Sequence, residues 1–170
     1  ALLDESFPLV KRHLWQTTIN NFTRLYKWEG SDTTLRPALL YAHYDVVPIE
    51  TTSMNDWKHA PFSGDVDAEF VWGRGAIDDK IGVMAALEAA EKALQQGFIP
   101  KRTIWLVLGH DEETGGLDGA AAAAAFLDSV GVKTEFHLDE GGLIGTGIVP
   151  NMQAPVALVG TAEKGYMTLK

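Results

Sequence analysis

The chain has 170 residues, of which 46% are hydrophobic and 22% charged, enough for one globular domain with a proper core. Its net charge of −9, from 23 acidic and 14 basic residues, argues against nucleic acid and against an anionic membrane surface as partners. Cysteine is absent, so any metal site must use His, Asp and Glu. No apolar stretch approaches the roughly 20 residues that span a bilayer.

The first half of the chain predicts an alternation of helix and strand. Leu9–Asn21 is predicted as an opening helix. The apolar run 37–43 begins with a proline and predicts a buried strand. Residues 48–68 are rich in Pro, Gly, Ser, Thr and Asp, which predicts a long loop, and 69–73 predict a short strand after it.

The second half continues the same alternation. Asp79–Gln96 carries apolar residues at helical spacing, and Gly97 follows as the stop signal. A second buried strand is predicted at 103–109, a helix at Leu117–Val130 and a third strand at 134–139. Two further strands are predicted at 155–163 and 166–170.

These elements predict an α/β fold. Apolar runs without strict alternation indicate strands that are covered on both faces, with helices between them. We expect a three-layer domain in which helices flank a mostly parallel mixed sheet. Ligands bind at the carboxyl ends of the strands in such sheets. Four successive strand ends carry side chains that can bind a metal: His43 and Asp45; Asp78 and Asp79; Asp111, Glu112 and Glu113; Asp139 and Glu140.

The stretch GHDEETGG (109–116) places two adjacent glutamates directly after a buried strand, where like charges repel unless a cation lies between them. Zn²⁺ binds imidazole nitrogen and carboxylate oxygen, and a two-zinc site also needs a bridging carboxylate and a base for the bound water. One glutamate of the pair would serve as that base. The candidate ligands are His43, Asp78, Glu113 and Asp139.

Each of these side chains also has a structural alternative. Asp79 suits the N-cap of the helix that starts there, and Asp111 suits the turn before the paired glutamates. The structural alternative is weaker for Asp78, Glu112 and Glu113, because acids in a cleft without a positive partner lower the stability of the fold. No role is assigned to the other histidines, which are His13, His59, His110 and His137.

Five motifs, in order and at suitable spacing, resemble the zinc-dependent M20 metallopeptidases. They are HYDVVP (43–48), WKHAPFSG (57–64), GRGAIDDK (73–80), GHDEETGG (109–116) and LDEGG (138–142). The pattern is similar to the carboxypeptidase S (Gly-Xaa carboxypeptidase) branch, which also contains N-acyl-amino-acid hydrolases. The resemblance covers roughly residues 5–170.

The resemblance implies a role for each position of the motifs. His43 and Asp139 bind the first zinc, and Asp45 hydrogen-bonds the imidazole of His43. Glu140 is the alternative to Asp139. Asp78 bridges the two zincs, and the peptide that follows it is often cis in the family. Glu112 is implied as the general base and Glu113 as a ligand of the second zinc.

The implied reaction is hydrolysis of an amide bond that releases a C-terminal amino acid from a small peptide. An N-acyl-amino-acid amidohydrolase is the alternative, because the motifs do not separate these two substrates. A non-catalytic cation-binding or oligomerising module is a third hypothesis. It is disfavoured because a protein that only binds a cation does not need a second glutamate as a base.

The family also has a lid domain and a last histidine on the second zinc, and no residue here matches either. We therefore expect this chain to be the N-terminal part, residues 1–170, of a longer catalytic domain, with little activity by itself. The resemblance also allows a homodimer through the lid domain, and a vacuolar, lysosome-like or secreted location, with the cytoplasm left open.

Overall fold

The structure is a computed structural model that describes residues 2–162. It divides into two compact units, one ending at Asp139 and the other beginning at Glu140. In the described part of the second unit, β6 (Ile144–Gly145) and β7 (Val156–Ala157) pair antiparallel. None of the helices between residues 2 and 162 is long and apolar enough to cross a membrane.

The first unit holds the central sheet and all of the α-helices that the structure describes. Two short 3₁₀ helices, η1 and η2, lie in its loops. The elements in chain order are α1 (Leu2–Ser6), α2 (Pro8–His13), β1 (Trp15–Ile19), β2 (Thr23–Trp28), β3 (Ala38–His43), η1 (Thr51–Asp56), α3 (Lys80–Gln95), β4 (Ile104–Gly109), η2 (Glu112–Thr114), α4 (Ala120–Ser129) and β5 (Phe136–Leu138).

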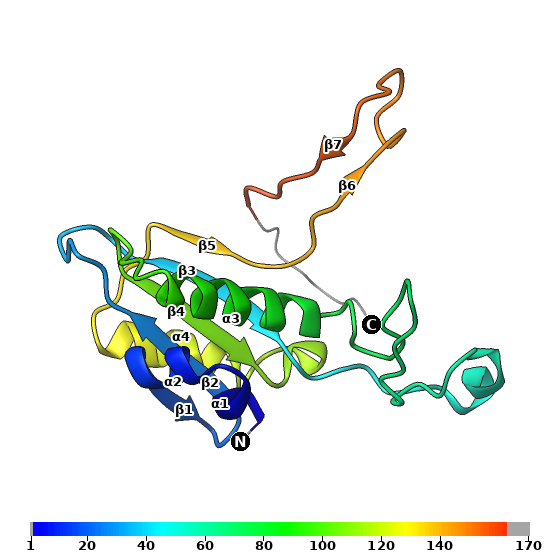
Figure 1. The fold of residues 1–170 in the computed structure, drawn as a ribbon, viewed down its shortest axis with the longest axis horizontal. Coiled ribbons are helices and arrows are strands. Elements are labelled where there is room, and N and C mark those ends of the chain that lie inside the picture. The colour runs from blue at the N-terminus through cyan, green and yellow to red at the C-terminus, as the bar shows by residue number, and fades with distance from the viewer. Residues whose placement is uncertain (1, 163–170) are drawn as a thin grey trace, which may run out of the picture. The chain divides into compact units, whose positions relative to one another are not determined.

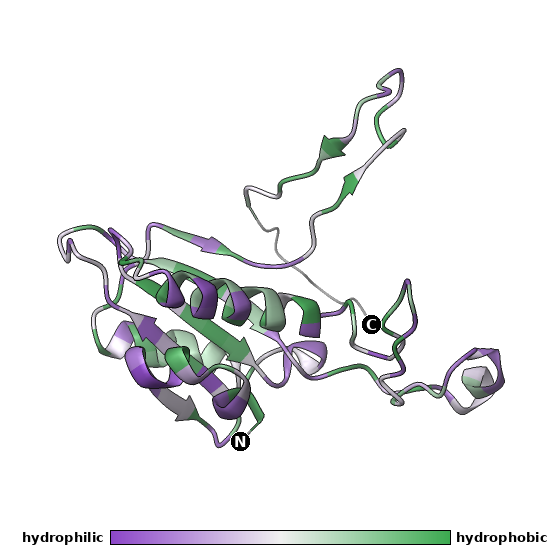
Figure 2. Ribbon diagram, viewed as in Figure 1, coloured by the Kyte–Doolittle hydropathy of each residue, from purple (hydrophilic) through white to green (hydrophobic). Residues whose placement is uncertain are grey.

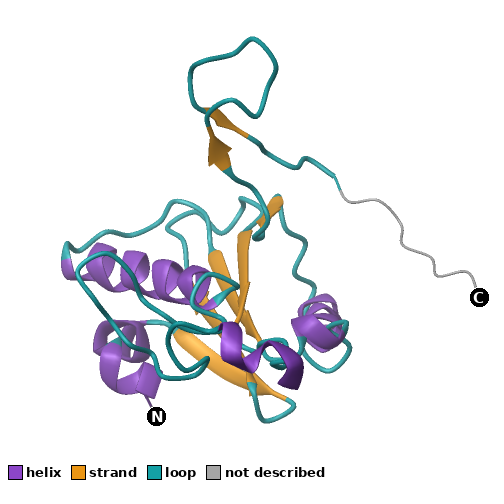
Figure 3. Cartoon of the chain, turned by 90° about the vertical axis from the view of Figure 1, so that its right-hand side faces the viewer, coloured by secondary structure: helices purple, strands orange, loops and turns teal. Residues whose placement is uncertain are grey.

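The sheet has five strands in the order β1-β2-β4-β3-β5. Figure 3 shows strands in orange with helices beside them in purple. Strand β2 runs antiparallel to both of its neighbours, whereas β3 is parallel to β4 and to β5. Four of the five strands therefore run in one direction and only β2 runs in the other. This is the mostly parallel mixed sheet that the sequence predicted.

Helices cover both faces of this sheet, as Figure 1 shows for α3 on one face and α4 on the other. Alternate residues of β4 supply the two cores, because successive side chains of a strand point to opposite faces. Leu106 and Leu108 pack with Leu87 of α3, whereas Trp105 and Val107 pack with α4. Figure 2 shows that β4 is almost uniformly hydrophobic, as expected for a strand buried on both faces. The three-layer prediction is confirmed.

The opening helix was predicted too long. Helix α2 ends at His13, and the residues from Trp15 onward form β1, which turns back into β2 as a hairpin. The turn uses Asn20 and Asn21, which have φ values of 48° and 67°. Asparagine tolerates this left-handed conformation, so the two residues match a tight hairpin turn better than a helix end.

Two other strand predictions differ from the structure, and a third is not tested by it. The predicted strand at 69–73 contributes only the isolated bridge between Val66 and Val71. Of the predicted strand at 155–163, the structure describes only Val156–Ala157 as strand. The prediction at 166–170 lies outside the described residues. The helix at Asp79–Gln96 and the strands at 37–43 and 103–109 are confirmed to within two residues.

The core between α3 and the sheet yields a test of the fold. Leu87 is completely buried in it. We expect Leu87→Ala to lower the free energy of unfolding by about 2–5 kcal/mol, because the truncation leaves a cavity. The matched control is Met84→Ala on the same helix, where the side chain is 44% exposed. Urea denaturation measures both, and equal losses would contradict the packing described here.

Candidate metal centre

The site lies at the carboxyl ends of the parallel strands β3 and β4. His43 is the last residue of β3 and pairs in register with Gly109, the last residue of β4. The chain leaves β4 through His110 and Asp111 and enters η2 at Glu112. The histidine of one motif and the paired glutamates of another therefore meet, because parallel neighbours end at the same edge of a sheet.

The imidazole of His43 is completely buried and has acids at both ring nitrogens. Its Nδ1 hydrogen-bonds the backbone carbonyl oxygen of Asp45 at 3.2 Å and lies 3.2 Å from Oδ1 of the same residue. Its Nε2 lies 3.1 Å from Oδ1 of Asp78 and 3.7 Å from Oε2 of Glu112. A partner on Nδ1 fixes the orientation of the ring and leaves Nε2 directed at the remaining acids, which is the usual arrangement of a metal-binding histidine.

Asp45 also holds the turn that carries the paired glutamates. The backbone N–H of Glu112 donates to its Oδ1 at 3.2 Å, and that of Glu113 donates to its Oδ2 at 3.0 Å. The resemblance implied only the contact with the imidazole, so this second function is a finding of the structure. One carboxylate thus links the orientation of His43 to the position of both glutamates.

The two aspartates at positions 78 and 79 have different environments, and the peptide bond between them is cis. The side chain of Asp78 is 59% exposed and faces His43. Asp79 is buried and caps α3, where it accepts a hydrogen bond from the N–H of Gly82 at 3.1 Å. It also accepts from the backbone N–H of His43 at 3.3 Å. Burial, assisted by the charge of Asp78, raises the pKa of Asp79. Asp79 therefore has the structural role considered above.

The structure brings three of the predicted ligands together. One ligand atom each from His43, Asp78 and Glu113 lies within 4.8 Å of the other two. Zinc binds imidazole nitrogen and carboxylate oxygen at about 2.0–2.2 Å, and two ions that share a site lie roughly 3.5–4 Å apart, so ligand atoms this close together suit such a centre after small shifts. These residues therefore fit a divalent metal ion by both their chemistry and their separation.

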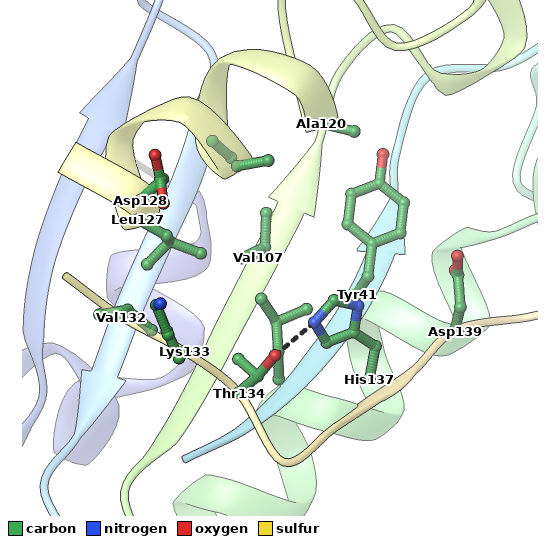
Figure 4. Close-up of a pocket in the computed structure, with 13 residues that line it drawn as sticks. Tyr41, Val107, Ala120, Leu127, Asp128, Val132, Lys133, Thr134, His137 and Asp139 are labelled. Carbon is green, nitrogen blue, oxygen red and sulfur yellow. Dashed lines mark hydrogen bonds between the residues drawn. The ribbon is translucent and has the colours of Figure 1, made fainter. Parts of the chain in front are cut away.

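Asp139 is not a member of this three-residue group. It follows the end of β5 and lines a cavity of about 400 Å³ beside α4, together with Tyr41 and His137 (Figure 4). Leu40 of β3 pairs with Leu138 of β5. One residue further along the same register, Asp139 comes next to Tyr41.

Glu112 lies at the edge of the group, with its side chain 45% exposed. Burial is the main cause that raises its pKa, and the charges of Glu113, Asp45 and Asp78 act in the same direction, against the influence of His43. A carboxylate with a raised pKa accepts a proton more readily, which suits a general base.

Two further side chains near the strand ends were not singled out from the sequence. Tyr41 precedes His43 by two residues, and burial together with the charges of Asp139 and Glu112 raises its pKa. The period of two in a strand was the signal that could have placed it on the same face as His43. Thr23 Oγ1 lies 2.6 Å from Nδ1 of His110, so that histidine has a structural partner.

Known proteins are similar to this chain both in sequence and in fold. Residues 39–161 match the model of peptidase family M20/M25/M40. A relative named "Probable carboxypeptidase S-like 2" from Dictyostelium discoideum is 43% identical over 97% of this chain and 32% of its own length. The human "N-fatty-acyl-amino acid synthase/hydrolase PM20D1" is 43% identical over 89% of the chain and 29% of its length.

Among solved structures, a "M20 family metallo-carboxypeptidase" from Sulfolobus solfataricus superposes with a TM-score of 0.62 at 21% identity, over 82% of this chain and 31% of that protein. At this identity the likeness concerns the fold alone. The chain spans about a third of the length of the relatives it matches. The family match covers most of the chain and includes every residue of the site, so the chain belongs to peptidase family M20/M25/M40.

Proposed function

We propose that the full-length protein is a zinc metallopeptidase that hydrolyses the amide bond of small peptides and releases the C-terminal amino acid. The observation that carries this proposal is the grouping of His43, Asp78 and Glu113 beside a second glutamate that can serve as a base. Family membership and the relative named carboxypeptidase S-like support it. On this proposal, residues 1–170 are one part of the catalytic domain of the protein.

The proposed ligands form a co-catalytic site for two zinc ions. His43 and Asp139 would hold the first ion, Glu113 the second, and Asp78 would bridge them. Asp45 occupies Nδ1 of His43 and Nε2 faces Asp78, which supports His43 as a ligand through Nε2. When bound, zinc lowers the pKa of a coordinated water and polarises the scissile carbonyl.

The residues of the chain supply the proton transfer. Glu112 accepts a proton from the attacking water and passes it to the nitrogen of the leaving amine, which keeps the reaction balanced. Its Oε2 lies 3.7 Å from Nε2 of His43, so the base stands next to the proposed ligand. Asp45 holds the backbone of the base and the imidazole in one arrangement.

A second substrate class has a specific observation in its favour. The human relative that is named for fatty-acyl-amino acid synthesis and hydrolysis is also 43% identical to this chain, although over 89% of it, compared with 97% for the carboxypeptidase S-like relative. Both names concern an amide next to an amino acid, so the same centre would serve either reaction. An N-acyl-amino-acid amidohydrolase is therefore the alternative.

Replacement of the proposed base tests the mechanism. We expect Glu112→Gln in the full-length protein to lower kcat by about 10²–10⁴-fold, because the amide cannot accept the proton. Zinc content should stay unchanged, which metal analysis of the same preparation checks. Glu50→Gln, an exposed glutamate outside the site, is the control. A variant at position 112 that keeps the rate of the wild type would refute the assignment.

Replacement of Glu113, the proposed ligand next to the base, should change the binding of zinc. We expect Glu113→Gln to weaken zinc binding at one of the two positions by at least about tenfold, because a neutral amide is a poorer ligand. Competition with a chromogenic chelator measures the affinity of each position. Two unchanged affinities would show that Glu113 is not a ligand.

The proposed activity itself is tested on the full-length protein with two panels, dipeptides with a free carboxylate and N-acyl amino acids. We expect turnover of at least one panel, its loss on chelation and its recovery with zinc, since the metal activates the water. The preferred panel decides between the two substrate classes. Turnover that survives complete removal of metal would contradict the proposal.

A further inference from the structure

Two buried polar atoms near the metal centre have no hydrogen-bond partner among the described residues. They are the hydroxyl oxygen of Tyr41 and Oδ1 of Asp111. A buried polar group without a partner destabilises the folded state, so such groups normally have an explanation. These two are complementary, since a phenol can donate the hydrogen bond that a carboxylate accepts.

The hydroxyl of Tyr41 lies next to Gly109, the last residue of β4 before the turn of the paired glutamates. The side chain lies on the same face of β3 as His43, and Figure 4 shows it rising from the strand toward Ala120 at the start of α4. The hydroxyl lies so close to Gly109 that a Cβ there would collide with it. Gly109 is not among the glycines with positive φ, so its lack of a side chain serves to make space.

Asp111 is the residue that organises the turn of the paired glutamates. Its Oδ2 accepts from the N–H of Asp118 at 2.7 Å, and its carbonyl oxygen accepts from the N–H of Gly116 at 2.8 Å. The other carboxylate oxygen, Oδ1, lies against Gly119, where a Cβ would collide with it. The same Cβ would lie 3.0 Å from Oγ1 of Thr23.

We infer that Tyr41 is a positioning residue of the metal centre, whose hydroxyl donates through one buried water to Oδ1 of Asp111. The hydroxyl of Tyr41 occupies the room left by the missing side chain of Gly109, and Oδ1 of Asp111 occupies that of Gly119, where Thr23 Oγ1 offers a third polar partner. Buried waters make two to four hydrogen bonds, so three partners of this kind form a suitable site.

The bridge gives the turn a second support besides Asp45. Asp45 accepts the backbone N–H groups of Glu112 and Glu113, whereas Asp111 fixes the start of the same turn. The significance of this support rests on the proposed function, in which Glu112 is the base. Small displacements of a catalytic group cost rate, because proton transfer depends on the geometry of the reacting atoms.

The test removes the hydroxyl and keeps the ring. In the full-length protein, Tyr41→Phe is expected to lower kcat about tenfold, with KM and zinc content unchanged, because only the position of the base is affected. Amide hydrogen exchange at residues 112–116 should become faster. The matched control is Tyr44→Phe, which removes a hydroxyl that donates to the carbonyl of Phe22 at 2.7 Å and should leave kcat and this exchange unchanged.

A double-mutant cycle with Asp111→Asn tests the link itself. Tyr41→Phe should add nothing to the loss of kcat caused by Asp111→Asn, because both act through the same bridge. Additive losses, or a Tyr41→Phe variant with the kcat and exchange of the wild type, would overturn the inference. If the wild type has no turnover on any substrate, the proposed function fails instead, and the exchange measurement still decides whether the bridge exists.

Discussion

The arrangement of the metal centre depends on the carboxylate of Asp45. It contacts Nδ1 of His43 and accepts the backbone N–H groups of Glu112 and Glu113, which come from a different strand. Charge-assisted hydrogen bonds of this kind are stronger and more directional than neutral ones. Because one side chain makes all three contacts, the ring of the proposed ligand and the two glutamates cannot shift independently. The carboxylate of Asp45 therefore sets the separation between the imidazole of His43 and the turn that carries Glu112.

The sheet makes this interaction possible. Strands β3 and β4 are parallel neighbours, and their last residues, His43 and Gly109, are paired in register. Helices pack on both faces of the sheet, so the strand ends have little freedom to move. Helix α3 adds a second constraint, because its N-cap, Asp79, accepts the backbone N–H of His43. Two elements that are distant in sequence thus hold the same histidine.

Much of the larger unit could be predicted because its segments have clear local signals. Strands β3 and β4 are continuous apolar runs, and α3 has an apolar face, an N-cap and a following glycine. The hairpin of β1 and β2 has a local signal only at its turn, Asn20–Asn21, and the stretch after Leu9 was predicted as helix. Its strand conformation depends on the pairing of β2 with β4 and on the two cores, one of which buries Tyr26 and the other Leu25. Local propensity is a weak guide where tertiary packing decides the outcome.

The sequence by itself determined the types of residue at the strand ends, their order and the family to which the motifs belong. Residue type can be read directly from the sequence, and histidine together with aspartate and glutamate at predicted strand ends indicates a metal site. Only the tertiary structure decided which of these residues meet. It brought Asp45 under the paired glutamates, made Asp79 a helix cap and left Oδ1 of Asp111 and the hydroxyl of Tyr41 buried beneath the turn. Burial and hydrogen-bond partners arise between segments far apart in the chain, so spacing along the sequence does not specify them.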